Sequence, residues 1–74
     1  MQTKIRLNDL DGAKEFVRAA SKCDFDIDVY FNKIALDAKS ILGMMSLDPR
    51  NTITVDFVGD NANFSSVLAK YAVQ

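Results

Sequence analysis

The sequence of 74 residues predicts a single α+β domain in which helices cover one face of a four-stranded, mainly antiparallel sheet. Four segments alternate polar and apolar residues, as strands with one buried face do. Three segments carry apolar residues at the spacing of one helical face. The order is β-α-β-β-α-β-α without linkers or repeats, and a two-layer open-faced sandwich is the simplest fold that buries all of these faces.

The first strand and the first helix are predicted near the N-terminus. Thr3, Ile5 and Leu7 alternate with polar residues and form one face of a strand over residues 2–7. Residues that commonly cap helices then precede a helix expected over residues 11–22. The apolar face of this helix consists of Ala13, Phe16, Val17 and Ala20.

A hairpin is predicted next, with strands over residues 25–31 and 34–37. Asn32 and Lys33 form the short turn between them. Apolar and polar residues alternate through the first of these strands, which therefore has one buried face. The buried face consists of Phe25, Ile27, Val29 and Phe31.

The second half of the chain predicts a short helix, a strand and a final helix. Ser40 is well suited to cap the short helix over residues 40–47, and a turn at residues 48–51 ends it. A segment rich in β-branched residues predicts a strand over residues 52–58. The last helix, over residues 62–71, has an apolar face of Phe64, Val67, Leu68 and Tyr71. The expected core consists of Phe16, Phe25, Ile27, Val29, Ile53, Val55, Phe57, Phe64 and Leu68.

The composition excludes several classes of function. Nine basic and ten acidic residues form no long block of one sign, so no nucleic-acid partner is expected. No apolar segment is long enough to span a bilayer, so we expect a cytoplasmic protein without membrane association. The lone cysteine, Cys23, cannot form an internal disulfide, and we interpret it as core filler rather than as a reactive thiol. With one cysteine and no histidine, we expect no metal site. We also expect no cofactor, and we expect a monomer.

Two segments resemble the HPr family, the histidine-containing phosphocarrier proteins of the bacterial sugar phosphotransferase system. They are Ala-Ser-Lys-Cys-Asp-Phe-Asp-Ile at residues 20–27 and Lys-Ser-Ile-Leu-Gly-Met-Met-Ser-Leu at residues 39–47. The second has the form Lys-Ser-Ile-x-Gly-x-Met-Ser-Leu, and the order of elements agrees with the fold of the family. The resemblance covers nearly the whole chain. It implies one HPr-like domain over residues 1–74 with a role in the phosphotransferase system.

In the HPr family, a Gly-x-His-Ala-Arg-Pro motif opens the first helix, and its histidine accepts a phosphoryl group from enzyme I. Counting back without gaps from residues 20–22, the histidine position falls on Asp9, the arginine position on Asp11 and the proline position on Gly12. Carboxylates at the first two positions would repel phosphate rather than hold it. The resemblance therefore implies a divergent member without the active-site histidine and without a catalytic residue.

Asp9 has two interpretations. A carboxylate at a helix N-terminus can serve as a replacement phosphoacceptor, or it can imitate a phosphorylated histidine. The interpretation that we favour is a helix N-cap, which contributes about 1 kcal/mol.

Ser40 also has two interpretations. It corresponds to the serine that a dedicated kinase phosphorylates in many HPr proteins, and it is equally suited to be a plain N-cap. A phosphate there would add about −1.5 to −2 charges at the positive end of the short helix. We expect Lys39, Ile41, Leu42 and Met45 to form a partner-binding surface, the alternative being a helix that only packs on the sheet.

The sequence thus predicts a protein that is not an enzyme but a regulatory or protein-interaction module controlled by phosphorylation at Ser40. Its expected partners are phosphotransferase components, a serine kinase or a transcriptional regulator. Two alternatives stay open. The protein could be a phosphocarrier that uses a different acceptor residue, or the HPr fold could be reused for unrelated protein binding.

Overall fold

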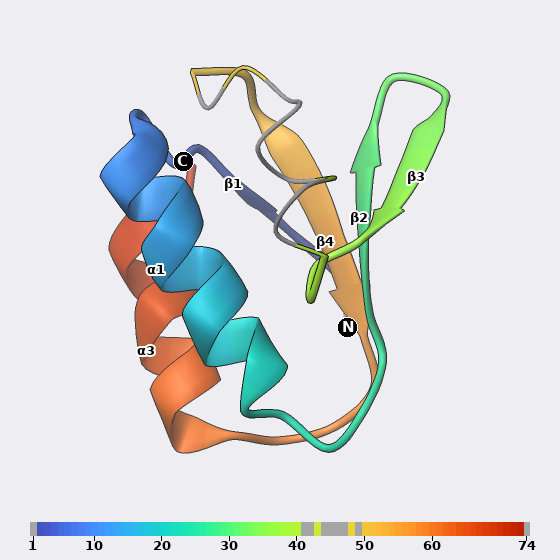
Figure 1. The fold of residues 1–74 in the computed structure, drawn as a ribbon, viewed down its shortest axis with the longest axis vertical. Helices are drawn as coiled ribbons and strands as arrows, with labels where there is room; N and C mark the ends of the chain where they lie inside the picture. The colour runs from blue at the N-terminus through green and yellow to red at the C-terminus, as the bar shows by residue number, and fades with distance from the viewer. Residues whose placement is uncertain (1, 41–42, 44–47, 49, 74) are drawn as a thin grey trace.

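The computed structural model describes residues 2–40, 43, 48 and 50–73, which form two layers (Figure 1). The helices α1 and α3 lie side by side over one face of the sheet, so the α+β sandwich expected from the sequence is confirmed. The short helix expected over residues 40–47 lies outside the described residues, apart from Ser40 and Gly43. The elements are β1 (Gln2–Ile5), α1 (Leu10–Ser21), β2 (Ile27–Phe31), β3 (Ile34–Asp37), β4 (Ile53–Phe57) and α3 (Ala62–Tyr71).

The sheet has the strand order β1-β4-β2-β3, and all neighbouring strands are antiparallel. Because side chains alternate between the two faces along the central strands, every second side chain faces the helices. Val29 of β2 lies opposite Val55 of β4, and both are fully buried. The next pair in the register, Asp28 and Asp56, belongs to the opposite face of the sheet.

The strands are shorter than alternation alone predicts. The strand expected over residues 25–31 begins at Ile27, because Phe25 leaves the ladder and stacks on Phe57 with ring centroids 5.8 Å apart. The strand expected over residues 52–58 ends at Phe57, and the following Val58 is 86% exposed. Tertiary packing at the strand ends therefore sets the boundaries.

The core lies between the sheet and the two helices. The Phe64 ring lies 5.8 Å from that of Phe16 and 5.2 Å from that of Phe57, between centroids, so α1, α3 and β4 meet there. All residues expected in the core are buried except Phe25, which is partly buried against it. Cys23 is buried as well, as core filler should be. Within the described part of the chain, neither helix is long and apolar enough to cross a membrane.

Candidate functional site

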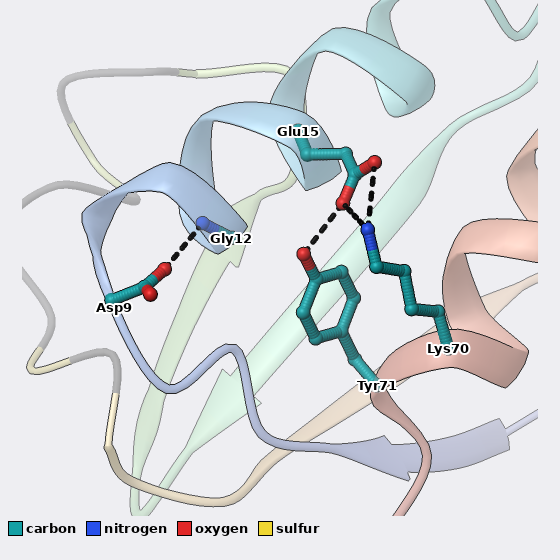
Figure 2. A network of polar contacts seen from close by, with 5 residues as sticks. All are labelled: Asp9, Gly12, Glu15, Lys70 and Tyr71. Carbon is teal, nitrogen blue, oxygen red and sulfur yellow. Dashed lines mark hydrogen bonds and ion pairs between the residues drawn. The ribbon is translucent and has the colours of Figure 1, made fainter.

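Helix α1 begins directly after a tight turn. Asn8 has a φ of 71°, and the Asp9 N–H donates to the Leu7 carbonyl at 2.8 Å. Asp9 is extended, with a φ of −152°, and its Oδ1 accepts a hydrogen bond from the Gly12 N–H at 2.8 Å, drawn in Figure 2. Asp9 is thus the N-cap of α1, and its charge lies at the positive end of the helix dipole.

The same turn requires a glycine at position 12. A Cβ atom on Gly12 would lie 2.2 Å from the Leu7 carbonyl oxygen and 3.3 Å from Cε1 of Tyr71. A backbone oxygen cannot swing aside as a flexible side chain can, so any side chain at this position displaces the turn. Proline would also lack the N–H that Asp9 accepts. The cap at Asp9 and the absence of a side chain at Gly12 are therefore two features of the same turn.

Glu15 holds α1 against the C-terminal end of α3 (Figure 2). The Tyr71 hydroxyl donates to Glu15 Oε1 at 2.5 Å, and Lys70 Nζ donates to the same oxygen at 3.0 Å. These hydrogen bonds, first that of Tyr71 and then that of Lys70, hold the pKa of Glu15 below its usual value. The hydrogen bond to Glu15 and burial raise the pKa of Tyr71. Sequence reasoning missed this contact, because its partners are 55 and 56 positions apart.

A surface depression of about 420 Å³ joins the cap of α1 to the Glu15 contact. Both signs of charge line it, and water screens all of them because the side chains are exposed or half-exposed. The sequence offers no imidazole, and the charged side chains of the depression are exposed or half-exposed, so the depression suits contact with a polar protein surface better than group transfer. Its lining consists of Asp9, Asp11, Gly12, Lys14, Glu15, Arg18, Lys70 and Tyr71.

A row of exposed side chains continues along α1 from its first residue. Leu10, Lys14, Arg18 and Lys22 are four positions apart and therefore lie on one side of the helix. Leu10 is 54% exposed, so the row begins with an apolar side chain that solvent can reach. Sequence reasoning missed this row as well, although its four-residue spacing is visible in the sequence.

Ser40 is exposed, and its Oγ accepts a hydrogen bond from the Gly43 N–H at 3.3 Å, as an N-cap does. Lys39 is half-buried, and its Nζ donates to the Cys23 carbonyl at 3.0 Å, beyond the C-terminal end of α1. Its ammonium group is thus engaged within the molecule. Burial raises the pKa of the Cys23 thiol. The other residues of the expected partner surface, Ile41, Leu42 and Met45, lie outside the described residues.

Comparison with known proteins identifies the family. Residues 10–71 match the family model described as PTS HPr component phosphorylation site. The chain belongs to the HPr family. It is also similar to a crystal structure of HPr-C-His from Thermoanaerobacter tengcongensis, with a TM-score of 0.74 and 26% sequence identity over 95% of this chain and 88% of that chain. The resemblance seen in the sequence is therefore confirmed.

HPr-family proteins are phosphocarriers rather than enzymes, and they act on other proteins of the phosphotransferase system, so membership implies protein partners for this chain. The matched residues begin at Leu10, directly after Asp9. The assignment of the histidine position to Asp9 and of the arginine position to Asp11 therefore stays a prediction. Among the described residues, no group of three or more acidic, cysteine or histidine side chains is placed to hold a metal ion.

Proposed function

We propose that this HPr-family protein is a cytoplasmic regulatory or protein-interaction module that does not carry a phosphoryl group on histidine. The observation that carries the proposal is the hydrogen bond from the Gly12 N–H to Asp9 Oδ1. This hydrogen bond makes Asp9 a helix cap, and Asp9 lies at the position where we expect the phosphoacceptor histidine of the family. The full sequence contains no histidine, so no other imidazole can replace it.

Charge at this end of α1 also opposes phosphoryl transfer. Asp9 and Asp11 lie at the expected positions of the histidine and the arginine, and Glu15 follows one turn later. A phosphoryl group would bring about two further negative charges to this surface. Of the cations that line the same depression, Lys70 is already bound to Glu15, and Lys14 and Arg18 lie exposed to water along α1. An incoming phosphoryl group would therefore meet carboxylates where the family is expected to provide an imidazole and a guanidinium.

We place regulation at Ser40 and docking at the residues around it, Lys39, Ile41, Leu42 and Met45. The exposure of Ser40 supports this, since a kinase must reach its hydroxyl. Its cap contact with the Gly43 N–H also supports it, because backbone N–H groups at a helix start can receive a phosphate. The exposed row that begins at Leu10 provides an apolar contact and positive charge for the same partners.

The regulatory part is tested by incubating the protein with an HPr-type serine kinase and ATP, followed by mass spectrometry. We expect one added phosphate on the wild type and none on the Ser40→Ala variant. Ser65→Ala is the matched control, because Ser65 is an exposed serine in the first turn of α3, and this variant should be labelled like the wild type. Equal labelling of wild type and Ser40→Ala would remove Ser40 from the proposal.

The docking part is tested by measuring binding to purified phosphotransferase components and to that kinase. A Leu42→Asp, Met45→Asp double variant should lose binding, because it places charge in the expected apolar contact. Val58→Asp is the control, since Val58 is an exposed apolar residue at the end of β4. Unchanged binding of the double variant would contradict the docking surface. If the wild type binds none of these proteins, reuse of the fold for unrelated binding becomes the better account.

A further inference from the structure

The two edges of the sheet differ. The β1 edge is covered by the chain's own C-terminal segment, because Ile5 forms a bridge with Ala72 and the Val73 N–H donates to the Lys4 carbonyl at 3.0 Å. The β3 edge has β2 on one side and, among the described residues, no strand on the other. It forms the right-hand margin of the sheet in Figure 1. Within the described part of the chain, the β1 edge is thus covered and the β3 edge, called the open edge below, is not.

We propose that the open edge binds a second copy of this chain, with the two β3 strands antiparallel about a two-fold axis at Ala35. This pairing joins the two four-stranded sheets into one continuous sheet. It departs from the monomer expected from the sequence, and it is independent of the regulatory role proposed above.

The backbone of β3 is oriented for such pairing. The Ala38 N–H donates to the Ile27 carbonyl at 3.0 Å, so these two residues form a hydrogen-bonded pair of the β2–β3 ladder. Because hydrogen-bonded and non-hydrogen-bonded pairs alternate, Ala35 and Asp37 direct their backbone groups away from β2. The Asp37 carbonyl accepts the Ser40 N–H at 3.0 Å. Both backbone groups of Ala35 and the Asp37 N–H therefore point to the open edge.

The side chains of β3 select one register. With Ala35 on the axis, Lys33 lies opposite Asp37 of the second copy, and Ile34 lies opposite Leu36 of the second copy. Opposite charges and apolar pairs in these places stabilise an antiparallel ladder. An axis at Lys33 or at Asp37 would instead place like charges directly opposite each other. Ile34 is 50% exposed in the single chain and becomes covered in this pairing.

Apart from its short length of four residues, the edge lacks the features that usually prevent self-pairing. From Ile34 to Asp37 there is no proline, no lysine and no charged residue directed toward the helix layer. The strand is short, however, and only a small area is buried when such strands meet. The dimer is therefore weak and populated at high protein concentration.

The experiment is sedimentation equilibrium from about 10 μM to about 1 mM, a range that resolves weak association. We expect the wild type to self-associate, and we expect Lys33→Asp and Asp37→Lys each to lower the association constant about tenfold, because like charges then face each other. A mixture of these two variants places opposite charges together again at both ends of the ladder. The mixture should therefore recover association close to that of the wild type.

Ala35→Pro is the backbone control. Proline at a position whose N–H points away from β2 preserves the ladder within the chain and removes the hydrogen bond between copies. We expect a monomer with an unchanged circular dichroism spectrum. A wild type that stays monomeric at about 1 mM would overturn the proposal. So would association that is unaffected by Ala35→Pro and by both charge variants, because a different surface would then be responsible.

Discussion

Replacing Gly12 by alanine should destabilise the protein, although the same change in most helices stabilises it. Alanine normally gains about 0.5–1 kcal/mol over glycine, because it loses less backbone entropy on folding. At position 12, the new Cβ atom would lie 2.2 Å from the Leu7 carbonyl oxygen, well inside any allowed contact. Either the turn or the start of the helix must therefore move.

The expected cost follows from these contacts. Overpacking of a rigid site costs about 1–3 kcal/mol. Movement of the helix start also weakens the cap bond between Asp9 and the Gly12 N–H, which contributes about 1 kcal/mol. After the gain in helix propensity is subtracted, we expect the free energy of unfolding to fall by about 1–3 kcal/mol. For a domain of this size, each kcal/mol lowers the melting temperature by about 4–8 °C.

Urea denaturation followed by circular dichroism measures this change at constant temperature. Asp9→Ala is the companion variant, because it removes only the cap and should cost about 1 kcal/mol. The double variant should lose less than the sum of the two, since both changes act on one turn. A Gly12→Ala protein as stable as the wild type, or more stable, would refute the close approach of Leu7 and with it the description of this turn.

Three further predictions concern other parts of the molecule. Asp28→Asn should raise the free energy of unfolding by about 0.2–1 kcal/mol at low salt, because its opposite neighbours on β3 and β4 are both aspartates; no gain in urea denaturation would contradict this. Tyr71→Phe should melt below the wild type at pH 7. The difference should shrink on acidification, because the lowered pKa of Glu15 stabilises the fold above its usual value of 4.5 and this contribution is lost as the pH falls through the folded value. A difference that is equal at pH 7 and pH 3 would exclude this linkage. Cys23 should be alkylated at pH 8 more slowly in the native protein than in urea, since the thiol is buried and its pKa is raised; similar rates would indicate an accessible thiol.

The sequence predicted the elements well where a single periodic pattern determines them. The strand expected over residues 34–37 and the helix expected over residues 62–71 have the predicted bounds, because turn residues flank both. The cap at Asp9 was predictable for the same reason, since the residue type and the start of the apolar face coincide.

Features that depend on contacts distant in the sequence were not predictable from such patterns. The requirement for Gly12 arises from the positive φ of Asn8, which brings the Leu7 carbonyl against the helix. The ladder order, with β4 between β1 and β2, and the contact of Glu15 with Tyr71 join segments that no local pattern connects. These features came only from the packing of the helix layer on the sheet.

The most direct test of the central claim is phosphoryl transfer from enzyme I. The wild type and the Asp9→His variant are incubated with enzyme I and labelled phosphoenolpyruvate, beside a histidine-containing HPr as positive control. We predict that only the control becomes labelled. The wild type has no histidine, and the variant retains Asp11 and Gly12 where the family is expected to have arginine and proline. Stable label on the wild type would identify a phosphocarrier with another acceptor residue and contradict the proposed regulatory role. Efficient labelling of Asp9→His would show that Asp11 and Gly12 do not prevent phosphoryl transfer.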